Sequence, residues 1–210
     1  MNREHRDFDK EAASWDEHPT RTKLAKDIGN AIVKQVTITS DMDALDFGCG
    51  TGLLTMQLQP LVRSITGVDS SQGMLNIFNA KVAGLQLANV TSRLCDLDKG
   101  DTLAGRYHLV VSAMTLHHIK EIGPLLRQCN AVMMPGATLC LADLDLEGGR
   151  FHEDNTGVFH FGFDRAALQA ILIEAGFVEI AAVTAANIEK PAGDGTMRRF
   201  TVFLMTARKG

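Results

Sequence analysis

Short apolar runs along this chain alternate with segments whose apolar residues recur at helical spacing. Continuous apolar runs, as at 107–113, predict strands that are buried on both faces of a sheet. Leu24, Ile28 and Ile32 recur every four residues and predict an amphipathic helix. Strands are predicted at 44–47, 64–69, 90–96, 107–113, 137–142, from 177 onward, and at 199–207. Helices are predicted at 72–83, 121–134 and 165–175, so the chain alternates strand and helix as an α/β fold does.

A glycine-rich turn follows the first predicted strand and precedes a helix-like run. Gly48, Gly50 and Gly52 stand at alternate positions there. Glycine permits positive φ and lets a ligand approach the main chain, and the helix N–H groups point at that ligand. A dinucleotide-binding turn would have a third glycine at Leu53, and a phosphate-binding P-loop would have a lysine after the glycines. Asp46, two residues before the first glycine, repels a pyrophosphate and suits a cation.

Two more carboxylates follow the next two predicted strands. Asp69 lies about 20 residues beyond Gly48, where folds of this kind place a carboxylate on ribose hydroxyls. Asp96 ends the third strand. The C-terminal ends of parallel strands meet at one edge of a sheet, and ligands of open α/β sheets bind there. The order and spacing of these acids therefore predict one nucleoside-type site.

The Asp-x-Gly-x-Gly-x-Gly pattern at 46–52 resembles motif I of the class I S-adenosylmethionine (SAM) dependent methyltransferases of the small-molecule type. The stretch 133–139 resembles the Pro-Gly turn before the fifth strand of that family. The resemblance implies one domain over 1–210, with a Rossmann-like seven-stranded, mostly parallel sheet, helices on both faces and an antiparallel last strand. It also implies an N-terminal helical lid over 1–36.

The resemblance implies SAM as the cofactor. In the family, the acid at Asp46 lies near the methionine amino group, and the acid at Asp96 accepts from the adenine amine beside Leu97. Met74 would pack against the adenine side, or is simply helix core. The implied cofactor residues are Asp46, Gly48, Cys49, Gly50, Gly52, Asp69, Ser70, Met74, Asp96, Leu97 and Met114.

We expect three segments to surround the methyl acceptor: the lid, the residues after the fourth strand, and an insertion at 146–163. The expected pocket residues are Trp15, Arg21 and His117, with Trp15 alternatively a core anchor and Arg21 alternatively a solvated surface residue. His117, His152, His160 or Asp145 could accept a proton from the acceptor or position it, since histidine titrates near neutrality. The insertion is alternatively a passive lid with structurally bonded histidines.

No metal site is predicted from the histidines or cysteines. His117 and His118 are adjacent, and on a helix adjacent side chains point apart by about 100°. A metal-bound acceptor in the insertion is a smaller alternative. The cysteines, Cys49, Cys95, Cys129 and Cys140, lack paired spacing and are expected to be reduced thiols.

Composition narrows the partners further. The formal net charge of −4 argues against a nucleic-acid substrate. No apolar run approaches the roughly 20 residues of a membrane span, and the first seven residues resemble no secretory signal. We therefore expect a cytoplasmic protein without a membrane partner; the sequence does not indicate its oligomeric state.

The sequence thus predicts methyl transfer from SAM to a small-molecule acceptor. Two alternatives belong to other classes. One is a SAM-binding regulator or inactive partner subunit. The other is an NAD-dependent oxidoreductase, against which Leu53 and the acids Asp69 and Asp96 argue.

Overall fold

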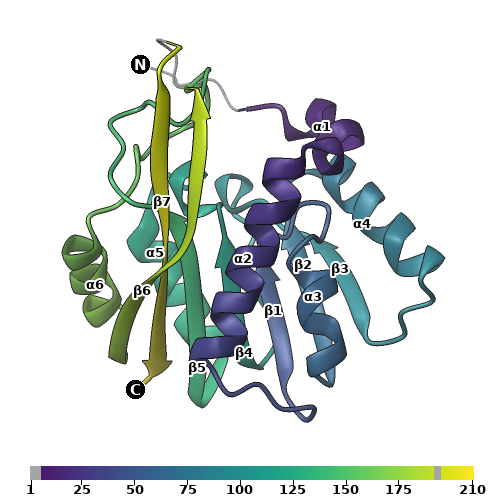
Figure 1. Ribbon diagram of the computed structural model, residues 1–210. Coiled ribbons are helices and arrows are strands. Elements are labelled where there is room, and N and C mark those ends of the chain that lie inside the picture. Colours follow the sequence, from purple (N-terminus) through teal and green to yellow (C-terminus); the bar gives the residue numbers. More distant parts are fainter. Residues whose placement is uncertain (1–5, 192–194) are drawn as a thin grey trace.

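A seven-stranded sheet forms the centre of the computed structural model, which describes residues 6–191 and 195–210 (Figure 1). Its strands are β1 Asp43–Phe47, β2 Ser64–Asp69, β3 Val90–Leu94, β4 Tyr107–Ala113, β5 Met133–Leu144, β6 Phe177–Pro191 and β7 Met197–Lys209. They lie in the order β3-β2-β1-β4-β5-β7-β6. The first five pair in parallel, whereas β7 runs antiparallel to both β5 and β6. This is the predicted Rossmann-like sheet with an antiparallel last strand.

Helices cover both faces of the sheet (Figure 1). They are α1 Phe8–Glu11, α2 Pro19–Gln35, α3 Thr55–Leu58, α4 Gln72–Gly84, α5 Ile122–Val132 and α6 Arg165–Glu174, with 3-10 turns η1 Ala12–Glu17, η2 Gln59–Leu61, η3 Leu97–Lys99 and η4 Leu116–His118. Apolar residues of α2, α3 and α4 form one buried cluster with the sheet. Those of α5 and α6 form a second cluster on the opposite face. The core is therefore two apolar layers separated by the sheet.

The structure moves several predicted boundaries. The helix predicted at 121–134 ends at Val132, and β5 begins at once, so Pro135 and Gly136 lie within a strand. Gly136 has a φ of +70°, and the β4–β5 register shifts nearby, between Tyr107 and Leu109. The last hairpin also has longer strands than predicted. The tip of that hairpin, 192–194, and residues 1–5 of the predicted lid lie outside the described residues.

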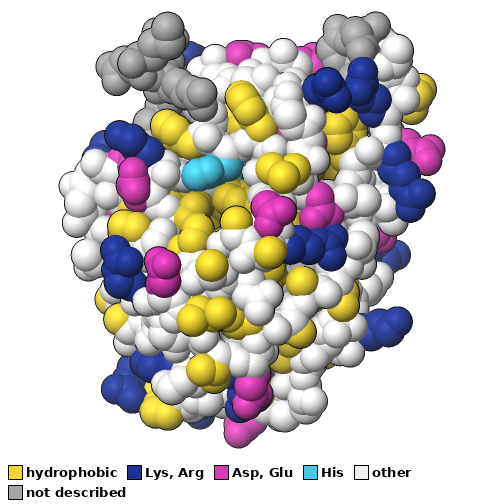
Figure 2. Space-filling view, turned by 90° about the vertical axis from the view of Figure 1, so that its left-hand side faces the viewer, with side chains coloured by type: hydrophobic (Ala, Val, Ile, Leu, Met, Phe, Trp, Pro, Cys, Tyr) yellow, Lys and Arg dark blue, Asp and Glu magenta, His cyan; other side chains and the backbone are white. Residues whose placement is uncertain are grey.

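The structure shows where the cysteines and the charged side chains lie. All four cysteines are free and buried. Burial raises the pKa of Cys129 and of Cys140 to about 12. Figure 2 shows Lys and Arg in small separate groups with acidic side chains near most of them, so the described part of this face has no continuous basic surface. Among the described residues, no helix is long and apolar enough to cross a membrane.

Candidate active site

A cavity of about 1490 Å³ lies at the edge of the sheet where the parallel strands end. It exceeds the roughly 300–1,000 Å³ of an ordinary ligand pocket, so it has room for a cofactor and an acceptor together. Of the predicted cofactor residues, the cavity is lined by Asp46, Gly48, Cys49, Gly50, Asp69, Ser70, Met74, Asp96, Leu97 and Met114. Gly52 is outside the lining.

The three glycines of the turn have different tasks. A Cβ on Gly48, whose φ is +71°, would lie 2.2 Å from the hydroxyl oxygen of Thr115. A Cβ on Gly52 would lie 2.7 Å from the ring of Phe78. A Cβ on Gly50, whose φ is +53°, would meet no atom of the described part of the chain within 4 Å. Gly48 and Gly52 therefore allow packing inside the protein, and Gly50 leaves bare main chain facing open space for a ligand.

Asp69 connects the glycine turn to the start of α4. Its carboxylate accepts hydrogen bonds from Gly50 N at 2.8 Å and from Ser71 N at 2.9 Å. Burial raises the pKa of Asp69 despite these bonds. A carboxylate offers about four lone-pair sites, so two backbone donors leave capacity for ribose hydroxyls. Asp69 is thus oriented by the fold and lines the cavity.

Asp46 is buried beneath the same turn, with 1% of its surface exposed. The hydroxyl of Thr55 donates to its Oδ2 at 2.5 Å. Burial raises the pKa of Asp46 to about 7, and the nearby charge of Asp69 adds to the effect. A cationic ligand in the cavity would lower the pKa of Asp46 again, because an opposite charge favours the ionised carboxylate.

The buried Asp46 carboxyl predicts that the ligand-free protein loses stability as the pH rises. A carboxyl whose pKa is raised on folding stabilises the folded state below its unfolded pKa of 3.8, and this contribution is lost as the pH rises to about 7. Urea unfolding between about pH 4 and 8 should show the free energy of unfolding fall by roughly 2–4 kcal/mol from this residue. Asp46→Asn, neutral throughout, should flatten the profile; an unchanged slope would contradict the assignment.

Asp96 and Leu97 stand beyond the end of β3. Asp98 N donates to Asp96 Oδ1 at 3.1 Å, and the ammonium of Lys99 lies 3.0 Å from Oδ2. Burial opposes ionisation, but Lys99 and the backbone donors hold the pKa of Asp96 below its usual range. Asp96 is therefore an ionised acceptor in the cavity wall.

The helical N-terminal segment docks over this edge (Figure 1). Asp9 accepts from Gly73 N at 2.8 Å and from the hydroxyl of Ser71 at the start of α4. Asp16 accepts from the hydroxyl of Thr51 at 2.6 Å and pairs with Lys81. Both acids thus connect this segment to the elements that hold the glycine turn.

Trp15 and Arg21 both line the cavity. The guanidinium of Arg21 lies 3.7 Å from the centroid of the Trp15 ring and 3.3 Å from a carboxylate oxygen of Glu11. Glu11 also pairs with Arg6, at 2.6 Å from its Nε. The charge of Arg21 therefore already has a partner within the N-terminal segment, and Trp15 is half-buried in the wall.

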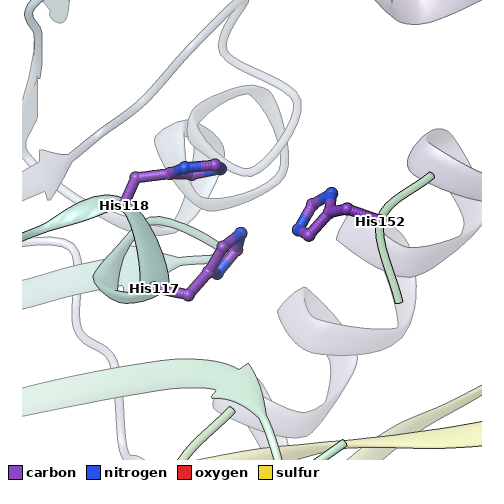
Figure 3. Close-up of side chains that lie close together, drawn as sticks. All are labelled: His117, His118 and His152. Atoms are coloured by element: carbon purple, nitrogen blue, oxygen red, sulfur yellow. The ribbon is translucent and has the colours of Figure 1, made fainter. Parts of the chain in front are cut away.

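Three histidines gather in the cavity wall beyond the end of β4: His117, His118 and His152 (Figure 3). The Nδ1 of His117 is 2.7 Å from Oδ1 of Asp143, which is fully buried in β5. Burial opposes ionisation of Asp143, but His117 and two backbone N–H groups hold its pKa below the usual range. An ionised carboxylate only accepts, so His117 Nδ1 is the donor of this bond, and Nε2 is the ring nitrogen left for another partner.

His118 and His152 complete this cluster. His118 Nδ1 donates to the carbonyl of Gly157 at 2.8 Å, which leaves its Nε2 lone pair free. Burial lowers the pKa of His118 and of His152 to about 3, and the neighbouring histidines contribute. Both rings are therefore neutral near pH 7.

The structure brings the rings of His117 and His118 close together, whereas the sequence predicted that these adjacent side chains point apart. His117 and His118 lie in the 3-10 turn η4, and their ring centroids are 4.1 Å apart. Adjacent side chains diverge by about 120° in a 3-10 turn, so the turn type alone does not bring the two rings together. Met114, just before this turn, has a φ of +56°, a rare conformation for a residue with a side chain.

Asp145 and His160 lie outside the cavity lining, which does not fit their expected roles as proton acceptors. Both oxygens of Asp145 accept from Arg165, at 2.7 and 2.8 Å, and one also accepts from Thr201. His160 Nε2 donates to the carbonyl of Ile119 at 2.9 Å. Both side chains hold the insertion and strand ends in place. Within 146–163, only residues between 151 and 157 line the cavity.

Sequence reasoning missed Asp143 as the partner of His117. The signal was present: an acid at the end of an apolar strand is buried and needs a partner. Because β4 pairs with β5 through Ala113 and Ala142, the residues that follow lie side by side. The sequence does not show which of Asp143 and Asp145 turns toward His117.

Known proteins resemble this chain in sequence. Residues 44–136 match the family described as a methyltransferase domain. An uncharacterized methyltransferase of Schizosaccharomyces pombe is 33% identical over 139 residues, which are 59% of this chain and 48% of that protein. A ubiquinone biosynthesis O-methyltransferase of Bradyrhizobium sp. is 29% identical over 113 residues, 53% of this chain and 44% of that protein. The chain thus spans about half the length of the curated relatives it matches.

The fold is shared with solved structures. A crystal structure of a SAM-dependent methyltransferase from Aquifex aeolicus superposes with a TM-score of 0.70 at 20% identity, covering 96% of this chain and 98% of that one. The matched methyltransferase domain contains the glycine turn, Asp69 and Asp96, and the shared fold supports the resemblance to class I SAM-dependent methyltransferases.

Proposed function

We propose that this protein transfers a methyl group from SAM to the oxygen of a small-molecule acceptor. The observation that carries the proposal is the order of groups along the sheet edge. Asp96, Asp69 and the glycine turn follow β3, β2 and β1, and the histidines follow β4. One cavity therefore joins a nucleoside-type site to a cluster of imidazoles.

The residues present fit SAM. Gly50 leaves open main chain, Asp69 and Asp96 supply oriented carboxylates, and the buried Asp46 favours a nearby cation. SAM supplies an activated methyl group, and its transfer leaves S-adenosylhomocysteine and releases the acceptor's proton. The protein's task is then to hold the acceptor atom in line with that group.

The acceptor end of the cavity is aromatic and enclosed by the N-terminal segment. Phe8, Trp15 and Phe151 line it beside the histidines. The ring of Phe8 packs edge-on against His118, with centroids 5.0 Å apart. Such walls suit a small, partly apolar acceptor. The similarity to ubiquinone biosynthesis O-methyltransferases supports an oxygen as the acceptor atom.

The test is release of S-adenosylhomocysteine with a panel of small phenols, alcohols and acids. We expect turnover with at least one acceptor. His117→Asn should lower that rate about 100-fold, because loss of a proton-accepting or positioning group costs about this much. His108→Gln, which alters a histidine at the opposite edge beside Asp43 N, should leave the rate unchanged. SAM binding without turnover on every acceptor would instead support a SAM-binding regulator or inactive subunit.

The other rival, an NAD-dependent oxidoreductase, gains no support from the comparisons. The family match and both sequence relatives described above are methyltransferases by name. The glycine turn also differs from that of dinucleotide sites. Its third glycine is Gly52, whereas a dinucleotide site would have glycine in place of Leu53.

A further inference from the structure

We infer that His117, His118 and His152 form a binding site for a divalent transition-metal ion of the zinc type, with an open position facing the acceptor end of the cavity. One ligand atom from each ring lies within 4.8 Å of the other two. The rings come from two segments, η4 and the loop after β5, and face a common space (Figure 3). The metal site stands on this geometry alone; only the assignment of its open position to the acceptor rests on the proposed function.

The lone pairs of two rings are already prepared for a metal. His117 gives its Nδ1 proton to Asp143 and His118 gives its Nδ1 proton to the Gly157 carbonyl, at 2.7 and 2.8 Å. In each ring Nε2 is therefore the nitrogen left to bind a metal. A metal-ligating histidine characteristically donates its other N–H to a carboxylate or a backbone carbonyl, which fixes the ring and raises its basicity.

His152 provides a second observation, separate from the grouping of the rings, that points to a bound ligand. Its Nε2 is buried and makes no hydrogen bond to any residue that the structure describes, and buried polar atoms without partners are rare in native structures. Among residues 6–191 and 195–210, the partner of its Nδ1 is Nη1 of Arg6, at 3.3 Å. On binding through Nε2, the imidazole proton moves to Nδ1 and that weak contact is lost. Arg6 keeps its two bonds to Glu11, at 2.6 and 2.9 Å.

Small movements bring the three nitrogens to bonding geometry. Tetrahedral zinc with three imidazoles needs nitrogens about 3.3 Å apart, so the rings must approach by up to ~1.5 Å. His152 can make this movement, because it stands on a loop where the next two residues, Glu153 and Asp154, are exposed. His117 and His118 are held by their hydrogen bonds to Asp143 and to the Gly157 carbonyl.

The donor set selects the class of metal. Three neutral imidazoles without a carboxylate ligand suit zinc, copper, nickel or iron, whereas magnesium and calcium require oxygen ligands. Three protein ligands leave a fourth tetrahedral position open, as in catalytic zinc sites. Asp143 partly balances the charge from behind His117. An acceptor with an ionisable oxygen or sulfur would occupy the open position, and the metal would favour its deprotonated form.

Zinc titration of the full chain, freed of any affinity tag and stripped with a chelator, tests the site. We expect about one equivalent of Zn²⁺ to bind with a dissociation constant on the order of 1 μM or tighter. His152→Ala and His118→Asn should each weaken binding at least ~100-fold, because even outer partners of metal ligands contribute 10–100-fold. His108→Gln is the matched control and should bind as the unaltered protein does. Co²⁺ in place of Zn²⁺ should give the visible absorption of a tetrahedral site.

The outcomes separate the metal site from the proposed function. No stoichiometric zinc in the unaltered protein, or equal binding by folded His152→Ala, would overturn the metal site. If SAM raised the thermal midpoint of the same zinc-free sample, the cofactor assignment would hold even though the metal site was wrong. Zinc binding that depends on His152, in a protein that SAM does not stabilise, would support the metal site and count against the methyltransferase activity.

Discussion

Asp69→Ala is expected to weaken SAM binding by about 100-fold. The carboxylate has spare acceptor capacity toward the cavity, and hydrogen bonds to a charged group contribute about 1.5–3 kcal/mol each. Loss of one to two such bonds to ribose hydroxyls corresponds to roughly 3 kcal/mol, or about 100-fold in the dissociation constant. Isothermal titration with SAM measures this directly.

The same substitution should also lower the thermal midpoint by several degrees. Gly50 N and Ser71 N lose their acceptor, although removing a buried carboxyl offsets part of that cost. Asp41→Ala removes an exposed acid before β1, at the opposite edge, and is the control for general charge effects. SAM affinity within threefold of the unaltered protein, in a folded Asp69→Ala variant, would remove Asp69 from the ribose site.

Alanine at Gly48 and at Gly50 should separate stability from binding. At Gly48 the new Cβ would overlap Thr115 at 2.2 Å, so we expect a loss of roughly 3 kcal/mol and a thermal midpoint lower by about 6–12 °C. At Gly50 the Cβ meets no atom, and only the positive φ costs about 1–2 kcal/mol. Its methyl group occupies ligand space, so SAM affinity should fall at least ~100-fold. Calorimetry and thermal unfolding of both variants measure the two effects.

Gly84→Ala provides the matched control for this pair. Gly84 lies at the end of α4, and a Cβ there meets nothing within 4 Å. This variant should bind SAM as the unaltered protein does and should be at least as stable, because alanine favours a helix over glycine by up to ~1 kcal/mol. If Gly50→Ala binds SAM normally, the cofactor does not approach the main chain at this turn.

The cofactor side was predictable because each of its groups lies at or just beyond the end of a parallel strand. Asp69 and Asp96 stand at strand ends, and the strand order brings such ends to one edge. Local sequence carries this information, since an apolar run, an acid and a glycine turn each have a clear pattern. The fold class followed from the same alternation of strands and helices.

The acceptor side was less predictable because its contacts depend on chain paths that periodicity does not encode. The path of the loop after β5 brings His152 to the cavity and takes His160 to the Ile119 carbonyl. The ring of His118 lies beside that of His117, although a 3-10 turn separates adjacent side chains by about 120°. Long-range packing thus decides which histidines share a site.

The central claim is that the cavity at the ends of β1, β2 and β3 holds the cofactor nucleoside. The most direct measurement is a crystal structure of the protein with S-adenosylhomocysteine. The expected result is a ribose within hydrogen-bond distance of Asp69 and an amino-acid moiety lying against Gly50. A nucleoside bound away from both residues, or no binding at millimolar concentration, would contradict the claim.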